Sequence, residues 1–232
     1  MSLQGKKVVV VGASGDIGTA VAWELTTQGS HVYNASSATM DVTSPGSVRE
    51  FLAHAWGSGT PALDGLVLCH GAPGCIKPTT ELTDVEFSKV IEVDLMGTFR
   101  VAREAARYMI ARGRGSIVAV SSIHAMATYP QRAAYAAAKA GVVGLMRALA
   151  IEWAVHGISV NCVLPGQVLR TRRTNGLKER SPGIEALSPG GAFVSTGDVA
   201  RAVCFLLDAP HGINGHSLVV DNGWTASAWK GQ

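Results

Sequence analysis

The fold is decided by residues 7–18, KVVVVGASGDIG, where four consecutive valines lead directly into a glycine-rich turn. An apolar run without alternation is typical of a strand covered on both faces. Glycines at 12, 15 and 18 permit a tight turn, close approach of a phosphate and tight packing of the next helix. Free N–H groups at a helix start favour negative charge. The stretch therefore predicts a dinucleotide site, with a packing turn that binds nothing as the alternative.

The rest of the chain alternates short β-branched runs with longer amphipathic runs. Strands are predicted at Lys7–Val11, His31–Ala35, Gly65–Cys69, Ser116–Val120, Ile158–Val163 and His216–Val220. Helices are predicted at Ile17–Gln28, Pro45–Trp56, Asp84–Val93, Thr98–Arg112, Ala134–His156 and Gly197–Leu207. We expect one α/β domain over residues 1–232, a Rossmann-type doubly wound parallel sheet with helices on both faces. Residues 166–195 form one long irregular stretch, which indicates a lid or binding loop.

Composition excludes several classes of protein. The 232 residues are 47% hydrophobic, enough for one substantial core. The net charge is only +3 and no run of Lys or Arg forms a stripe, so no nucleic-acid partner is expected. The N-terminus is unlike a signal peptide and no apolar stretch approaches a membrane span, which predicts a cytoplasmic protein with no membrane contact.

The four cysteines, Cys69, Cys75, Cys162 and Cys204, show neither a CxxC spacing nor a disulfide framework. Cys69 and Cys162 lie in apolar, strand-like runs, so buried reduced thiols are expected there. No metal site is expected.

Tyr135 and Lys139 stand four residues apart in a predicted helix, which places them on one face. A free phenol has a pKa near ~10 and exchanges protons poorly at neutral pH. A lysine ammonium one turn away favours the phenolate and makes the phenol a better acid. Ser122 ends a strand shortly upstream. Taken alone, the spacing occurs often by chance and favours a surface tyrosine beside a solvated lysine.

The end of the second predicted strand bears on the choice of cofactor. Asn34-Ala35-Ser36-Ser37 lacks the acidic residue that would hold both hydroxyls of an NAD ribose. Ser36 and Ser37 can donate hydrogen bonds to a 2′-phosphate, so NADP(H) is favoured and NAD(H) remains possible. No Arg or Lys stands at 15, 36 or 37. Asp41 is either an acceptor for the adenine amino group or a turn residue before Pro45.

Further motifs follow in order along the chain: Cys69-His70-Gly71-Ala72, Val93-Asp94-Leu95, Ser121-Ser122, Asn161-Cys162-Val163-Leu164-Pro165-Gly166 and Gly215…Asp221-Asn222-Gly223. Together with the glycine turn and the Tyr135/Lys139 pair, they resemble the short-chain dehydrogenase/reductase family over essentially the whole chain. The resemblance implies an NAD(P)-dependent oxidoreductase that interconverts a ketone or aldehyde and an alcohol by hydride transfer.

The resemblance also implies roles for single residues. Ser122 and Tyr135 would bond the carbonyl oxygen, and Tyr135 would act as general acid and base. Lys139 would keep the phenol acidic and bond the nicotinamide ribose, while Asp94 replaces an Asn that holds a water near the lysine in relatives. His124, which follows Ser122 in the sequence, either lines the substrate pocket with Ser122 and Tyr135 or merely packs. The implied cofactor site comprises Gly12, Ser14, Gly15, Asp16, Ile17, Gly18, Ser36, Ser37, Asp41, Val42, Cys69, His70, Gly71, Tyr135, Lys139, Pro165, Gly166 and Val168.

Three departures from the family pattern stand out. The helix and strand usual between Ser37 and Asp41 are almost deleted, so one sheet edge should be thin. The glycine spacing follows the family's extended members, yet 232 residues leave no room for their C-terminal lobe. Arg170, followed by Thr171, stands where a threonine usually contacts the nicotinamide amide.

Several features keep two interpretations. Gln131 and Arg132 are either substrate contacts or solvated loop residues, and Arg172, Arg173 and Lys178 either attract an anionic substrate or are solvated. Trp224 and Trp229 indicate packing or subunit contacts. The small residues of the helices at Thr98–Arg112 and Ala134–His156 suit helix pairing between subunits, and by resemblance a homotetramer or homodimer is expected.

Two other functions compete with the small-molecule oxidoreductase. A non-catalytic dinucleotide-binding regulator would keep the fold without the chemistry, and the intact Ser122, Tyr135 and Lys139 oppose it. Sugar-nucleotide epimerisation is suggested only by the glycine spacing and is opposed by the length of the chain.

Overall fold

A computed structural model of the protein describes residues 3–56, 63–169, 188–209 and 212–227. Six strands form one sheet in the order β2-β1-β3-β4-β5-β6, and all neighbours are parallel. The strands are β1 (Lys7–Val11), β2 (His31–Ala35), β3 (Gly65–Leu68), β4 (Gly115–Val120), β5 (Ile158–Pro165) and β6 (Ser217–Val220). The predicted Rossmann-type α/β fold is confirmed, and strand ends differ from the predicted ones by one or two residues.

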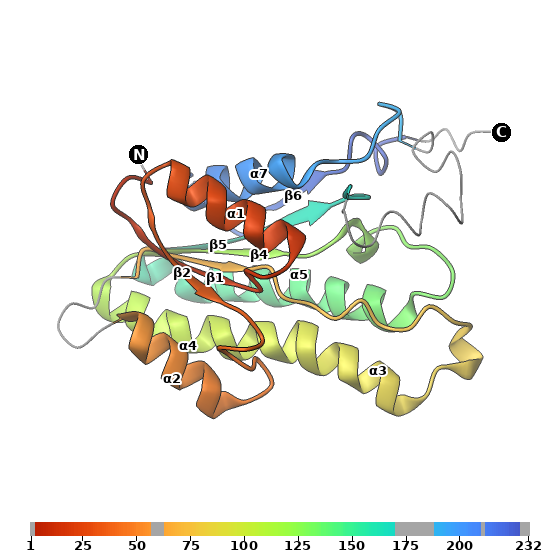
Figure 1. Ribbon diagram of the computed structural model, residues 1–232, viewed down its shortest axis with the longest axis horizontal. Coiled ribbons are helices and arrows are strands. Elements are labelled where there is room, and N and C mark those ends of the chain that lie inside the picture. Colours follow the sequence, from red (N-terminus) through yellow and green to blue (C-terminus); the bar gives the residue numbers. More distant parts are fainter. Residues whose placement is uncertain (1–2, 57–62, 170–187, 210–211, 228–232) are drawn as a thin grey trace.

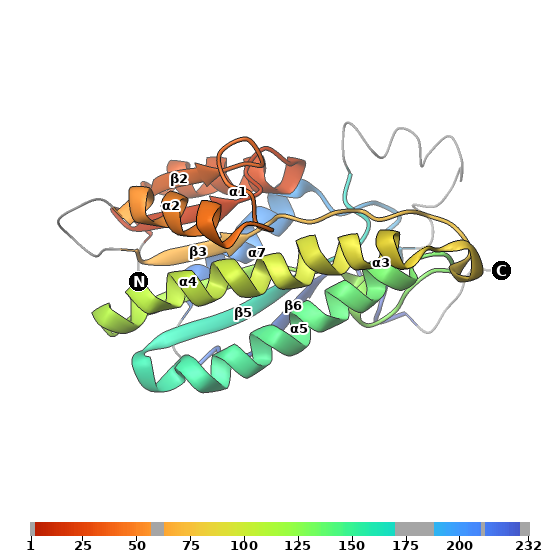
Figure 2. The same cartoon turned by 90° about the horizontal axis from the view of Figure 1, so that it is seen from below.

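Helices cover both faces of the sheet, as the apolar strands predict. On one face lie α1 (Asp16–Thr27) and α7 (Thr196–Asp208); on the other lie α2 (Pro45–Trp56), α4 (Gly97–Arg112) and α5 (Ala133–Trp153) (Figures 1 and 2). Alternate valines of β1 enter the two cores: Val8 and Val10 pack with α1 and α7, whereas Val9 and Val11 pack with α2, α4 and α5.

One helix boundary was predicted wrongly. The sequence indicates a break between Val93 and Thr98, but α3 (Asp84–Val90) continues through a π-helical segment, η2 (Ile91–Met96), directly into α4. Gly97, which lies between the two predicted helices, has ordinary right-handed helical dihedrals of φ −60° and ψ −47°. The wide π turn adds a residue to the helix and brings Asp94 to the fully buried side.

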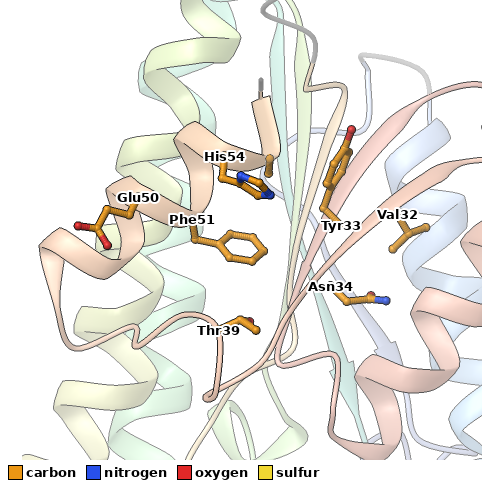
Figure 3. A pocket seen from close by; sticks show the side chains of 8 residues that line it. Val32, Tyr33, Asn34, Thr39, Glu50, Phe51 and His54 are labelled. Atoms are coloured by element: carbon orange, nitrogen blue, oxygen red, sulfur yellow. The ribbon is translucent and has the colours of Figure 1, made fainter. Parts of the chain in front are cut away.

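The deletion after β2 leaves that strand at the sheet edge, as expected. Residues 36–44 form tight turns in which the Met40 and Ser44 amides donate to the Ser36 and Asp41 carbonyls, and α2 begins at Pro45. A hollow of about 580 Å³ lies between β2 and α2. In Figure 3, Phe51 and His54 of α2 point toward Tyr33 of β2 across this hollow.

Within the described residues, one helical stretch, Ala133–His156, is long and apolar enough to cross a membrane, with a mean hydropathy of 1.4. The expectation that no apolar stretch reaches that length is therefore wrong. The stretch comprises α5 and the 3₁₀ turn η4 (Ala154–His156), and Val142, Met146 and Trp153 of α5 belong to the core beneath the sheet. A buried core helix passes the same test of length and composition.

Candidate active site

The glycine turn between β1 and α1 forms one end of the site. Gly12 has φ +79°, and a Cβ there would meet the His70 amide nitrogen at 2.7 Å. A Cβ on Gly18 would collide with the Gly12 carbonyl oxygen. Gly15 is the N-cap of α1 and has no side chain that could accept a hydrogen bond from the amides of the first helical turn. The turn thus presents donors at the positive end of a helix.

The other end of the site lies where β4 ends and α5 begins. Ser122 follows β4 in extended conformation, and its Oγ accepts a hydrogen bond of 3.2 Å from the His124 amide. The neighbouring Ser121 Oγ donates to the Lys139 carbonyl at 2.9 Å. This second bond ties the first turns of α5 to the tip of β4, which fixes the helix relative to Ser122.

Tyr135 and Lys139 lie one turn apart in α5, as the spacing predicts. The Lys139 Nζ is 5.5 Å from the centre of the Tyr135 ring, and Lys139 is only 5% exposed. Burial lowers the pKa of Lys139, but the phenol of Tyr135 and the carboxylate of Asp94 outweigh it, so the pKa is raised. The lysine therefore remains an ammonium at neutral pH.

Asp94 holds that ammonium directly. Its Oδ2 lies 3.0 Å from the Lys139 Nζ, and its side chain is fully buried. Its Oδ1 accepts a hydrogen bond of 2.6 Å from the Ala72 amide, and its carbonyl accepts one of 2.6 Å from the Thr98 hydroxyl. A Cβ on Gly71 would lie 3.0 Å from Oδ2 and 3.1 Å from Nζ, so a larger residue there would press on the ion pair.

A single cleft of about 770 Å³ connects the two ends. Its lining includes most of the predicted site: Ser14, Gly15, Asp16, Ile17, Gly18, Cys69, His70, Gly71, Ser122, His124, Tyr135, Lys139, Pro165, Gly166 and Val168. Val168 also pairs with Val194 in an isolated parallel bridge, which joins the described residues before 170 to those after 187. The cleft is long enough to bring the phosphate-binding turn and the tyrosine into one ligand site.

Five predicted cofactor residues do not line this cleft: Gly12, which shapes the glycine turn, and Ser36, Ser37, Asp41 and Val42. The Asp41 Oδ1 accepts from the amide and the hydroxyl of Thr43, and these bonds lower the pKa of Asp41. Asp41 is therefore a turn residue, which is one of the two roles considered for it from the sequence. Val42 is buried and lies beside Gly97, where a Cβ would meet both Val42 and His70.

An aromatic row borders the catalytic end. The His124 ring meets Tyr135 edge-on at 5.4 Å and Tyr129 at 5.1 Å, and Tyr129 meets Trp224 at 5.4 Å. Trp224 thus packs inside the protomer, one of its two expected roles; Trp229 lies outside the described residues. So do Arg170, Thr171, Arg172, Arg173 and Lys178.

Burial keeps three further ionisable groups in or near the cleft, Cys69, Cys162 and His70, neutral at pH 7. Burial raises the pKa of Cys69 and Cys162 to about 12. Cys162 is a buried free thiol, as expected, whereas Cys69 is only partly buried. Burial, with the Lys139 charge second, lowers the pKa of His70 to about 3. Among the described residues, no group of three or more His, Cys, Asp or Glu side chains is placed to hold a metal.

Sequence reasoning missed some of the cleft wall. Ala72, Pro73, Gly74 and Ile76 line it after β3, and Gln167 lines it near Val168. These residues lie in loops without periodicity, and only their place next to the predicted landmarks could have indicated them.

The residues fit a dinucleotide. Gly15 leaves open space where a Cβ would stand, with only the Gly12 carbonyl at 3.4 Å, so a phosphate can approach the backbone. The buried His70 Nδ1 has no partner among the described residues and lies in the cleft wall between the two ends. A parallel sheet with this turn and a Ser–Tyr–Lys set in one cleft defines a dinucleotide-binding α/β protein.

Comparisons with known proteins agree. A family model described as enoyl-(acyl carrier protein) reductase matches residues 1–225. The chain is 34% identical over 239 residues to the 3-oxoacyl-[acyl-carrier-protein] reductase FabG of Rickettsia felis, covering 96% of this chain and 98% of that one. It is 32% identical over 248 residues to D-threitol dehydrogenase of Mycolicibacterium smegmatis, covering 96% and 94%.

Solved structures give the same result. A gluconate 5-dehydrogenase from Burkholderia cenocepacia J2315, in complex with NADP and tartrate, superposes with a TM-score of 0.88 at 26% identity over 98% of both chains. The chain belongs to the short-chain dehydrogenase/reductase family.

Proposed function

We propose that the protein interconverts a ketone or aldehyde and an alcohol, with Tyr135 as general acid and base and Ser122 and Lys139 beside it. The observation that carries this proposal is the shared cleft, in which the glycine turn and all three side chains meet. Family membership supports oxidoreduction. A pure sensor has no need for a serine, a phenol and a buried ammonium in one place.

NADP(H) is the proposed cofactor, with NAD(H) the weaker alternative. The NADP complex of the gluconate 5-dehydrogenase supports this choice. The end of β2 supports it too, because Asn34 to Ser37 bring no carboxylate that would repel a 2′-phosphate. Ser36 and Ser37, together with the amides of the glycine turn, are the proposed contacts of the phosphates.

When bound, the nicotinamide supplies or accepts the hydride at the carbonyl carbon. The residues of the chain manage the charge on the oxygen. Ser122 and Tyr135 donate hydrogen bonds to it, and one such donor is typically worth ~2.7–4 kcal/mol in the transition state. Tyr135 then transfers its proton to the oxygen, and the Lys139 ammonium stabilises the phenolate that remains. Alcohol oxidation follows the reverse path, with the phenolate as base.

Beyond the site, three further proposals follow. Residues 1–232 act as one catalytic domain, with residues 166–195 as its lid. The protein works in the cytoplasm on a small carbonyl or alcohol compound, and it binds neither nucleic acid nor a membrane. The protein forms a homodimer or homotetramer. Exposed apolar side chains at the end of the α5 stretch, Ile151 and Val155, support a subunit contact there.

Fluorescence titration with NADPH and NADH, followed by a panel of ketones and alcohols, tests the proposal. We expect tighter binding of NADPH and turnover of at least one carbonyl compound. Binding without any turnover would instead favour the non-catalytic regulator, and absence of dinucleotide binding would contradict both functions.

A further inference from the structure

Arg132 is the one basic side chain of the described cleft lining that lacks an acidic partner. It lies in the wall at the catalytic end, together with Pro73, Gly74 and His124. The other lining cation, Lys139, is paired with Asp94. Within the described residues no carboxylate pairs with Arg132, whereas Arg100 and Arg112 have such partners.

The Arg132 guanidinium has donors to spare. Its only side-chain hydrogen bond among the described residues is a long one of 3.5 Å from Nη1 to the Pro73 carbonyl. A guanidinium carries five N–H donors in a rigid fork that matches a carboxylate. Arg132 is half-buried, so its guanidinium is only partly hydrated. A ligand that accepts hydrogen bonds from it therefore has less water to displace than at a fully exposed arginine.

The backbone in front of Arg132 is strained. Gln131 has φ +66°, and in the described part of the chain only Asn222 is another non-glycine residue with positive φ. This conformation is unfavourable for a glutamine side chain and persists only where the surroundings impose it. The left-handed residue reverses the chain immediately before α5 and places Arg132 at the N-cap, where its side chain enters the cleft wall.

His124 connects Arg132 to the reacting centre. The His124 ring meets Tyr135 edge-on, and burial and then the Arg132 charge lower the pKa of His124 to about 4. At pH 7 this histidine is neutral, so Arg132 supplies the only unpaired charge among the described residues of the catalytic end. Asp16 is the only acidic residue in the described cleft lining, and it belongs to the glycine turn at the opposite end.

We infer that Arg132 binds a carboxylate of the substrate, so the substrates are oxo acids and the corresponding hydroxy acids. The inference rests on the proposed function, since it assigns a substrate class to the same cleft. The names of the relatives do not decide this class, because they include a polyol as well as a sugar acid. Arg132 would orient the substrate with its carbonyl toward Ser122 and Tyr135 and its acid group toward the outer wall.

Matched substrates test the inference. We would measure kcat/KM for 4-oxopentanoate and 4-oxopentanamide, and for 4-oxocyclohexanecarboxylate and its primary amide, with NADPH. The wild type should prefer the acid of at least one pair by about tenfold or more, and the preference should weaken with added salt. Arg132→Gln should reduce the acid-to-amide ratio by about 10- to 100-fold, and Arg132→Lys by less, because lysine lacks the bidentate fork.

Arg107→Gln is the matched control, since Arg107 lies on α4 with an exposed side chain outside the cleft lining; it should leave the ratio unchanged. Calorimetric binding of the hydroxy acid to the NADP⁺ complex gives a readout independent of turnover and should weaken in Arg132→Gln. Turnover with no preference for the acid, or an acid-to-amide ratio that Arg132→Gln does not change, overturns the inference about Arg132. The proposed function would still stand after either result. Failure of every neutral and acidic carbonyl compound, with NADPH bound, would instead count against the proposed function.

Discussion

The Nζ of Lys139 lies 3.0 Å from the Oδ2 of Asp94, and both side chains are almost completely buried. The same ammonium stands 5.5 Å from the Tyr135 ring. Lys139 therefore shares its charge between a permanent anion and the phenol. An asparagine in place of Asp94 would leave the whole charge of the ammonium available to the phenol.

Asp94→Asn should move the pH at which alcohol oxidation reaches half its maximal kcat/KM to lower values, by about one pH unit. The reason is that a negative charge near the phenol opposes formation of the phenolate, and effective dielectric constants near 20 leave such effects at roughly that size. A pH–rate profile from pH 5 to 10 measures the shift. Glu92→Gln removes a carboxylate from the same π segment, where Glu92 pairs with Arg100 instead, and should leave the profile in place.

A profile that Asp94→Asn leaves unchanged, or moves to higher pH, would show that the carboxylate does not oppose the phenolate. Ionisation of Cys69, His70, His124 and Cys162 does not confuse the result, because burial keeps these four neighbours neutral between about pH 5 and pH 10.

His70→Asn should reduce the acid sensitivity of the fold. Burial lowers the pKa of His70 from 6.5 to about 3, so the unfolded chain takes up a proton at higher pH than the folded chain. Stability is therefore lost as pH falls from about 6.5 toward 3, by about 1–2 kcal/mol between pH 7 and pH 5 for this one group. Urea unfolding at both pH values measures it. His31→Asn changes an exposed histidine and should not alter the pH dependence.

Should the wild type and His70→Asn lose equal stability between pH 7 and pH 5, the ring is not kept neutral in the folded protein. The variant is expected to fold, because asparagine is smaller than histidine and the contact of the ring's Nε2 with the Thr98 hydroxyl is a long one of 3.4 Å.

Gln131→Gly should raise the free energy of unfolding by roughly 0.5–1.5 kcal/mol, because glycine adopts the left-handed conformation without steric cost. The φ of +66° at Gln131 motivates this substitution. Thermal and urea unfolding measure the gain. Ala137→Gly, at an exposed position in the interior of α5, is the opposite control and should be destabilising. A loss of stability in Gln131→Gly would mean that the glutamine side chain contributes more than its backbone costs.

Much of the site follows from local sequence pattern. The glycine turn, Ser122 at a strand end and the Tyr135/Lys139 spacing each depend on a few neighbouring residues, and the fold brings them to one cleft. The missing strand after β2 was also predictable, because the segment between Ser37 and Asp41 is too short to hold one.

Other features depend on tertiary contacts that no local pattern contains. The π turn at Ile91–Met96 accompanies a buried ion pair between Asp94 and a lysine of another helix. The two roles of Asp41 could not be separated until the turn with Thr43 was visible. The direction of Arg132 depends on the strained φ of Gln131, which sequence alone does not reveal.

The most direct test of the central claim is the turnover number of Tyr135→Phe, measured with NADPH and the best carbonyl substrate beside the dissociation constant of NADPH. Loss of a general acid predicts a kcat lower by about 10²–10⁴-fold with cofactor binding nearly unchanged. An unchanged kcat in a variant that binds NADPH normally would contradict the assignment of Tyr135 as the proton donor.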